Sequence, residues 1–308
     1  MNSIDDRMRP GAAQWLLLAL LFAGATALFT QLLRPLAAPE VATAIEAPAR
    51  IEPVAPPAPA APAPLAAPTA VTAAAAPAPA PVPAPAPAFD GPRIAIVLTD
   101  VGDNPAQARA AIEALPPEVG LAFTPYPDVL SLARAARADG HEIWAGVPMQ
   151  PKSWPRVSPG NNTLLVSEAA AENVRRLDWT LARVGGLAVG ITGIMGSAFT
   201  ENAAALRPVF DEAGRRNLTY LDARASGRSV GVETARAVGI RAARNDRFLD
   251  ESGSIAANLA ALEQQAKREG KAIGYARPLP GTVAALQAWA ATLEEKGIRL
   301  APPSTLAE

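Results

Sequence analysis

Short apolar runs alternate with amphipathic stretches through the chain after residue 90. The first run, Ile94 to Leu98, is rich in β-branched residues and ends at a polar turn. It predicts a strand buried on both faces, as in a parallel sheet. Asp100 follows at the carboxyl end of this strand, where the loops of α/β folds build ligand sites. An Asp at this position is also common as a turn or helix cap.

The alternation continues to the end of the chain. It predicts further extended segments at 119–124, 142–149, 187–194, 219–222, 240–244 and 271–277. Helical spacing of apolar residues predicts helices at 105–115, 128–138, 167–184, 201–216, 230–238, 254–269 and 283–296. The third of these helices has Ser167 as its expected cap. Repeated β-strand and α-helix units imply an α/β fold with a mainly parallel sheet, either closed as a barrel or open and doubly wound.

The amino-terminal segments have a different character. Residues 1–13 form a short polar tail, and residues 14–34 contain an apolar run long enough to cross a bilayer as one helix. Arg7 and Arg9 before the run favour an amino terminus on the cytoplasmic side. We expect an uncleaved transmembrane anchor. A cleaved signal peptide is the alternative, because Ala25-Thr26-Ala27 has the small-residue spacing of a cleavage site.

Residues 35–89 are almost entirely proline and alanine. Fifteen of the 32 prolines in the chain lie between Pro39 and Pro87. Proline blocks helix and sheet pairing, and few large side chains are present to form a core, so this segment predicts a disordered, semi-rigid linker. The organisation is therefore a tail, an anchor, a linker and one domain over residues 90–308.

Composition narrows the functional classes. The chain has no cysteine, which excludes disulfides and thiolate metal sites, and its formal net charge is −1. This charge gives no electrostatic basis for nucleic-acid binding, so nucleic acid is not an expected partner.

Polar side chains follow several predicted strands. If the strands are parallel, all of these side chains face one rim, which is the geometry of a substrate cleft. The candidate binding residues are Asp100, Asp103, Gln150, Ser197, Asp222, Arg224, Ser226, Asp246 and Arg277, with Asp250 nearby in the sequence.

Several motifs occur in an order that resembles the divergent polysaccharide deacetylases, bacterial envelope proteins related to the NodB-type carbohydrate esterases. The matching pieces are Ile-Ala-Ile-Val-Leu-Thr-Asp-Val-Gly (94–102), Leu-Ala-Phe-Thr-Pro-Tyr (121–126), Gly-His-Glu-Ile (140–143), Val-Pro-Met-Gln-Pro (147–151), Met-Gly-Ser-Ala-Phe-Thr (195–200), Leu-Asp-Ala-Arg-Ala-Ser (221–226) and Asp-Arg-Phe-Leu-Asp (246–250). The resemblance implies a distorted (β/α) barrel. For active relatives it implies metal-assisted hydrolysis of N-acetyl groups on a glycan, with zinc as the expected metal.

The chain departs from that family's active pattern at the metal site. The resemblance implies a second Asp at Thr99 and histidines at Gly146, Ile194 and Ala276. Hydrolytic zinc normally takes three His or carboxylate ligands, which a lone Asp100 does not supply, so we expect no metal and no other cofactor.

Other chemistry is specified only weakly by the residues present. A hard ion held by Asp100, Asp103, Asp222 and Asp246 is conceivable, but their spacing does not specify one. Ser197 lacks a neighbouring base and a nucleophile-elbow context.

We therefore predict a degenerate member of this family in carbohydrate metabolism. It is expected in the inner membrane as a single-pass protein, with its domain in the periplasm binding cell-wall glycan or an envelope protein. Trp144 or Trp154 could offer a sugar-stacking face, although Trp144 in a strand favours core packing. One alternative is an active hydrolase with a site rearranged around Asp100, Asp222 and His141, the only histidine. A purely structural interaction protein is the third.

Overall fold

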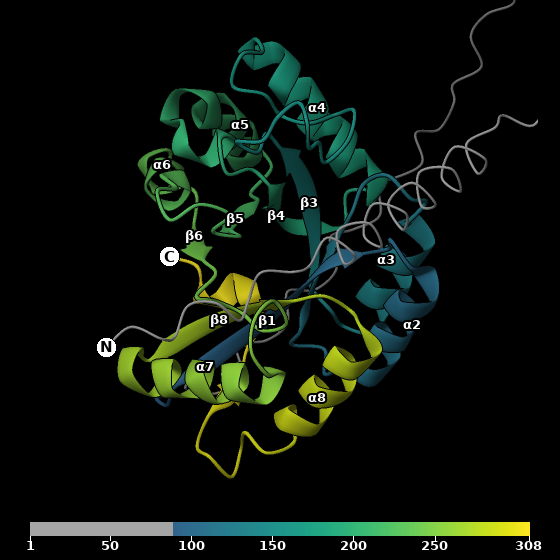
Figure 1. Ribbon diagram of the computed structural model, residues 1–308, viewed down its shortest axis with the longest axis vertical. Coiled ribbons are helices and arrows are strands. Elements are labelled where there is room, and N and C mark those ends of the chain that lie inside the picture. Colours follow the sequence, from purple (N-terminus) through teal and green to yellow (C-terminus); the bar gives the residue numbers. More distant parts are fainter. Residues whose placement is uncertain (1–88) are drawn as a thin grey trace, which may run out of the picture. The chain divides into compact units, whose positions relative to one another are not determined.

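Nine parallel strands form the centre of the fold, and helices cover one of the two faces of the sheet (Figure 1). The computed structural model describes residues 89–308. The predicted tail, anchor and most of the linker therefore lie outside the described residues. Within residues 89–308, no helix is both long and apolar enough to cross a membrane.

The strand order is β6-β5-β4-β3-β2-β1-β8-β7, and β9 also pairs with β1. All of these strand pairs are parallel. The strands are β1 (Arg93–Val101), β2 (Gly120–Phe123), β3 (Ile143–Met149), β4 (Ala188–Met195), β5 (Thr219–Asp222), β6 (Ala242–Arg244), β7 (Arg247–Phe248), β8 (Lys271–Ala276) and β9 (Arg299–Leu300). The helices are α2 (Pro105–Ala114), α3 (Leu130–Ala138), α4 (Ala170–Arg183), α5 (Ala203–Arg215), α6 (Gly231–Ala237), α7 (Ile255–Glu269) and α8 (Pro280–Ala290), with short 3₁₀ turns η1 (Phe199–Glu201) and η2 (Pro303–Leu306).

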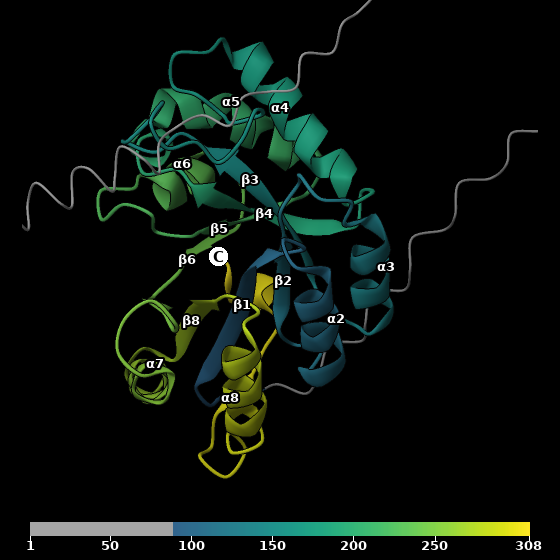
Figure 2. The same ribbon diagram turned by 45° about the vertical axis from the view of Figure 1, so that its right-hand side comes forward.

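The sheet curves into a half-barrel instead of closing as a full barrel (Figure 2). Its edge strands β6 and β7 do not pair with each other. The residues between them bridge the two edges: the Asn245 N–H donates to Asp222 O at 2.8 Å, and the Asp246 N–H donates to Ile273 O at 2.9 Å. The expected distorted barrel is thus met in part, because the curved parallel sheet is present but its ladder is interrupted at this seam.

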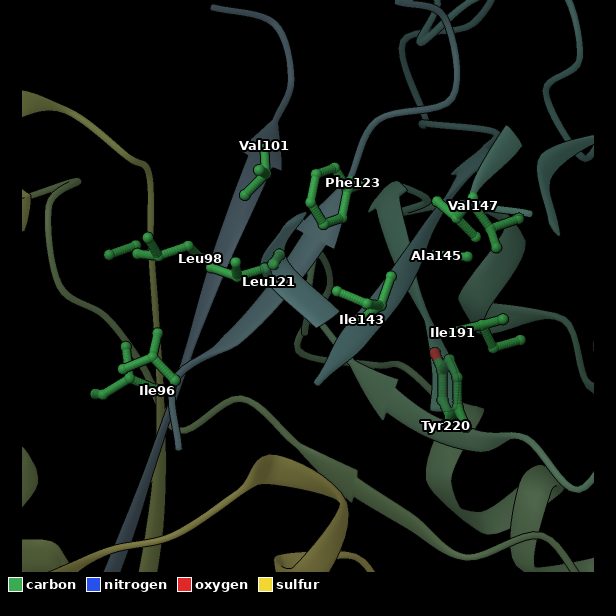
Figure 3. Packing of buried hydrophobic residues seen from close by; sticks show 14 of the residues in the cluster. Ile96, Leu98, Val101, Leu121, Phe123, Ile143, Ala145, Val147, Ile191 and Tyr220 are labelled. Atoms are coloured by element: carbon green, nitrogen blue, oxygen red, sulfur yellow. The ribbon is translucent and has the colours of Figure 1, made fainter. Parts of the chain in front are cut away.

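Alternating side chains of the strands enter two separate apolar clusters, as a sheet buried on both faces requires. On β1, Ile94, Ile96 and Leu98 join the large cluster between sheet and helices, part of which Figure 3 shows. Ala95 and Val97 join a smaller cluster inside the curve. The inner cluster fills part of the space inside the curved sheet. A ligand must therefore bind between this cluster and the solvent at one end of the strands.

The last residues of the chain fill the amino-terminal end of the half-barrel. Ala301 and Leu306 join the inner cluster. The Ser304 N–H donates to the Glu142 carboxylate at 3.0 Å, and Ala242 and Glu308 exchange two backbone hydrogen bonds. This segment, which we call the carboxy-terminal plug (residues 299–308), was not predicted from the sequence. It leaves the carboxyl ends of the strands as the accessible end of the interior.

Two predicted helix boundaries were wrong. Helix α4 begins at Ala170 with no side-chain cap, so Ser167 does not cap it. Helix α8 spans Pro280–Ala290 instead of 283–296. Proline fits the first turn of a helix because its missing N–H has no intrahelical partner there, and Pro280 sets the earlier start.

Candidate functional site

A cleft of about 810 Å³ lies at the carboxyl ends of the strands. Residues at or just after the ends of β1, β4, β5, β7 and β8 contribute to it, as the parallel topology predicts. Of the candidate residues, the structure brings three to the lining, Asp100, Arg224 and Arg277, together with Asp250. Its floor includes Tyr275, whose hydroxyl hydrogen-bonds with that of Thr192 at 2.9 Å.

Asp100 is the candidate carboxylate that lines the cleft at the end of β1. Burial, reinforced by the negative charge of Asp103, raises its pKa, and the nearby Arg277 guanidinium opposes this shift. Asp250 and Glu251 add further negative charge around it. Within residues 89–308, no hydrogen bond to the Asp100 carboxylate is found, and the Asp103 N–H donates to the backbone oxygen of Asp100 at 3.4 Å. The carboxylate is therefore available to a ligand entering the cleft.

Arg277 is held at the cleft by Asp250. Its Nε and its backbone N–H both donate to Asp250 Oδ2, each at 3.0 Å. The Asp250 side chain is 7% exposed, whereas that of Arg277 is 46% exposed. The buried carboxylate thus fixes one edge of the guanidinium and leaves the rest of the group toward solvent.

Asp222 lies behind the cleft lining. It is 3% exposed and accepts from the Arg224 N–H at 2.7 Å and from the Ser229 hydroxyl. Burial raises its pKa, while these two hydrogen bonds act in the opposite direction. Both carboxylate oxygens are occupied in shaping the turn after β5, so the geometry gives Asp222 an orienting role.

Three cleft residues adopt a left-handed backbone conformation that only glycine tolerates easily. Asp100, Met195 and Arg224 have φ values of +57°, +59° and +60°. Such conformations are strained for residues with a Cβ, and they concentrate at functional sites. Met195, which also lines the cleft, was not predicted from the sequence, and the residue is 41% exposed. The Met195-Gly196 pair after a strand was the local signal of a sharp turn.

Other candidates lie outside the cleft lining and hold neighbouring loops in place. Asp103 accepts from the Thr124 hydroxyl at 2.7 Å. The Gln150 side chain accepts from the Val166 N–H at 2.7 Å, and Ser197 Oγ accepts from the Lys152 N–H at 3.0 Å. Ser226 donates to the carboxylate of Glu201. The expectation that the candidates face one cleft therefore holds for Asp100, Arg224 and Arg277 and not for these four residues.

The rearranged hydrolase site is also contradicted as a cluster. His141 is 1% exposed before β3, at the amino-terminal end of the sheet, and its ring nitrogens contact Val119 O at 2.9 Å and Ile112 O at 3.2 Å. It does not line the cleft that contains Asp100. Asp246 is likewise away from the cleft, since its Oδ2 accepts from the Ile273 N–H at 2.8 Å within the seam.

The two tryptophan candidates do not line the cleft either. Trp144 is fully buried in the inner cluster, in agreement with core packing. Trp154 is half-buried in the loop after β3.

The residues that the resemblance places at metal-ligand positions meet in this cleft, but they do not fit zinc. Thr99, Gly146, Ile194 and Ala276 line it with Asp100, so these five positions supply one carboxylate and no imidazole. A Cβ added at Gly146 would lie 2.8 Å from Phe123 O and 2.9 Å from Ile194 Cδ1. Across residues 89–308, no group of three His, Cys, Asp or Glu side chains is placed to hold a metal ion.

Glu201 joins two loops beside the cleft. Its carboxylate accepts from Lys152 Nζ at 2.5 Å, from Arg228 Nη2 at 3.0 Å and from Ser226. Hydrogen bonds from Arg228, Lys152 and Ser226 lower the pKa of Glu201 to about 2. We call these four residues the Glu201 network.

The Glu201 network predicts an acid-dependent loss of stability. Because the folded pKa is below the ordinary value of 4.5, the stabilisation is complete above about pH 4.5 and is lost as the pH falls towards 2. In Glu201→Gln, the urea midpoint should fall less steeply over that interval than in the wild type. Glu113→Gln, on the exposed face of α2, is the charge-matched control. Identical acid dependence in Glu201→Gln and the wild type would contradict the assignment.

Comparisons with known proteins agree with this architecture. Residues 96–307 match the divergent polysaccharide deacetylase family. An uncharacterized protein of Haemophilus influenzae is 31% identical over 212 residues, which cover 68% of this chain and 74% of that protein. The uncharacterized protein YibQ of Escherichia coli is 29% identical, over 63% of this chain and 61% of YibQ.

A crystal structure of an uncharacterized protein from Agrobacterium tumefaciens shares the fold. The TM-score is 0.69 with 33% identity, over 72% of this chain and 91% of that one. The family match begins at Ile96 within β1 and covers the rest of the half-barrel, including the cleft and most of the carboxy-terminal plug. This chain therefore belongs to the divergent polysaccharide deacetylase family.

Proposed function

We propose that the protein binds a glycan in the cleft at the carboxyl ends of the strands and that this binding does not use zinc. The observation that carries the proposal is the composition of the cleft. Asp100 and the Arg277–Asp250 pair line it together with the aromatic residues Phe248 and Tyr275, of which Tyr275 is fully buried. Sugars present hydroxyl groups around apolar ring faces, so they need charged or polar hydrogen-bonding groups next to apolar surface.

The volume of the cleft is also suited to this class of ligand. Small-molecule sites typically measure about 300–1,000 Å³, and this cleft is about 810 Å³. Asp100 accepts hydrogen bonds from hydroxyl groups, and the exposed edge of Arg277 donates them. Gly146 and Ile194 provide an apolar wall at the former metal position.

The location of this binding forms part of the proposal. Residues 14–34 anchor the chain in the inner membrane, and residues 35–89 hold the domain in the periplasm, where cell-wall glycan is present. The support comes from the apolar run and the proline content. A polyproline II linker extends roughly 3.1 Å per residue, which allows the domain to reach away from the membrane surface.

Binding of a neutral chitooligosaccharide tests the proposal. In isothermal titration of the full-length protein, N,N′,N″-triacetylchitotriose should bind with a Kd of about 1 mM or tighter. Arg277→Ala should weaken binding about tenfold, because it removes a charged hydrogen-bond donor from the cleft.

Lys152→Ala is the matched control for this substitution. Its side chain is 49% exposed and paired with Glu201, much as the 46% exposed Arg277 is paired with Asp250. Lys152 lies outside the cleft lining, so its replacement should leave the Kd unchanged. Absence of heat up to roughly 10 mM sugar in the wild type would overturn the glycan assignment and favour a protein partner.

A further inference from the structure

We propose that Arg224 is an anion-binding residue of the cleft and that the preferred glycan carries a carboxylate group. This inference rests on the proposed glycan binding and adds the chemistry of the ligand. It is carried by three features of the structure: the position of Arg224, the charge distribution of the cleft, and the way in which Asp222 fixes the turn.

Arg224 differs from the other cations near the rim of the cleft. Arg277 is paired with Asp250, and both Lys152 and Arg228 are paired with Glu201. Arg224 lines the cleft and is exposed, and its guanidinium makes no salt bridge within residues 89–308. The only hydrogen bond found for Arg224 in this part of the chain uses its backbone N–H. Its side chain is therefore free to pair with a ligand.

The charged residues of the cleft lining come from several strand ends. The carboxylates are Asp100 at the end of β1 and Asp250 and Glu251 after β7, and the cations are Arg224 after β5 and Arg277 after β8. Of the two cations, Arg277 is paired with a carboxylate of the lining, Asp250. Arg224 is therefore the cleft cation that a ligand anion can reach without displacing a salt bridge.

The groups packed around the Arg224 turn leave its guanidinium without a hydrogen-bonding partner among residues 89–308. A small pocket beneath the turn is lined by Asp222, Glu233 and Arg244 in addition to Arg224 itself. The Asp222 carboxylate interacts electrostatically with Arg224, but both of its oxygens already accept other hydrogen bonds. In formal charge Arg244 balances Glu233 and Asp222 balances Arg224, so what the guanidinium lacks is a hydrogen-bonding partner. A ligand carboxylate is the group that would complete the pairing of Arg224.

Asp222 positions Arg224 through the main chain. Its Oδ1 accepts from the Arg224 N–H at 2.7 Å, which is the hydrogen bond of an Asx turn. The turn places Arg224 at φ +60°, a conformation that a residue with a side chain rarely adopts. A buried, fully hydrogen-bonded carboxylate maintains this strained conformation, as expected where the direction of a side chain matters.

Two disaccharides separate this inference from the general proposal. N,N′-diacetylchitobiose is neutral, whereas N-acetylglucosaminyl-N-acetylmuramic acid is a closely similar disaccharide that carries a lactyl carboxylate. With the full-length protein, the muramic acid disaccharide should bind about tenfold more tightly than the chitobiose, because a charge-assisted hydrogen bond to Arg224 is added.

The variant Arg224→Gly should abolish that preference without unfolding the protein. Glycine adopts the left-handed conformation freely, so the Tm should be unchanged or slightly higher. Asn217→Gly is the matched control, since Asn217 also has φ +56° but lies before β5, outside the cleft. This control should keep the tenfold preference.

The outcomes are distinguishable. Equal affinity of the wild type for the two disaccharides would overturn the role of Arg224 and leave the proposed glycan binding standing. A preference that survives in Arg224→Gly would likewise overturn the role of Arg224 and leave the proposed glycan binding standing. If neither disaccharide nor the trisaccharide binds, both proposals fail together. Asp222→Ala should reduce the preference for the muramic acid disaccharide; an unaltered preference in a folded Asp222→Ala protein would contradict its positioning role.

Discussion

Replacing Gly146 by histidine should lower the free energy of unfolding by about 3 kcal/mol or more and should not create a zinc site. The added Cβ alone would lie 2.8 Å from Phe123 O and 2.9 Å from Ile194 Cδ1. The first contact is with backbone in the middle of a parallel sheet, which cannot move without disturbing the ladder. Overpacking of this kind is costly because protein interiors are already close-packed.

Urea unfolding of Gly146→Ala, Gly146→His and Gly281→Ala measures this effect. Gly281 lies in α8 with no atom within 4 Å of the added Cβ and with no left-handed φ. Alanine there should be neutral or stabilising by up to about 1 kcal/mol, because it has a higher helix propensity than glycine. A stable Gly146→His protein that binds one equivalent of zinc would show that the cleft retains a latent metal site, contrary to our interpretation.

Replacing Trp144 by alanine should cost about 3–5 kcal/mol, the range found for removal of a buried aromatic side chain. Trp144 has no exposed surface and lies at the centre of the inner cluster. Two glycines make room for the ring: a Cβ at Gly190 would lie 2.2 Å from its Cζ3, and one at Gly120 would lie 3.0 Å from its Nε1. No neighbouring side chain can fill the space without a rearrangement of β2 and β4.

Trp144→Phe separates packing from hydrogen bonding at this position, and Trp154→Ala is the control at a less buried tryptophan. The indole Nε1 of Trp144 has no hydrogen-bond partner within residues 89–308, so Trp144→Phe loses volume but no hydrogen bond. It should therefore cost less than half as much as Trp144→Ala. Trp154→Ala, in the half-buried loop after β3, should cost about 1 kcal/mol or less. Equal losses from Trp144→Ala and Trp154→Ala in urea unfolding would contradict the assigned inner core.

The fold was predictable from the sequence because its signals are local. Buried parallel strands have continuous apolar runs, and the run in β1 identified both the strand and the carboxyl end at which Asp100 lies. The curvature and the open seam were not predictable in this way. They depend on pairings between distant residues, such as those of Asn245 with Asp222 and of Asp246 with Ile273.

Short elements carried too little sequence pattern to be found. Strands β7 and β9 have two residues each, and the carboxy-terminal plug is recognisable only from what it covers. The start of α8 could have been predicted, because a proline such as Pro280 is common at the first position of a helix.

The location of the candidate site could be predicted from the sequence, but the set of residues that line it could not. Asp100 lies at the end of β1, Arg224 and Arg277 follow strands, and all three line the cleft. Gln150 also follows a strand, yet its side-chain oxygen accepts a hydrogen bond from the Val166 N–H. Whether a polar side chain faces solvent or a neighbouring loop is decided by tertiary hydrogen bonds, which sequence spacing does not encode. Met195 shows the converse, since an apolar residue reaches the cleft through an unusual backbone conformation.

A crystal structure of the full-length protein with N,N′,N″-triacetylchitotriose would test the central claim most directly. The account predicts sugar density in the cleft at the carboxyl ends of the strands, with hydrogen bonds to Asp100 and Arg277. It also predicts an apolar ring face toward Phe248 and no metal ion between sugar and protein. Sugar bound elsewhere would contradict the account, for example in the groove between α2 and α8 that Leu115, Ala290 and Ile298 line. A metal ion bridging Asp100 and the sugar would also contradict it.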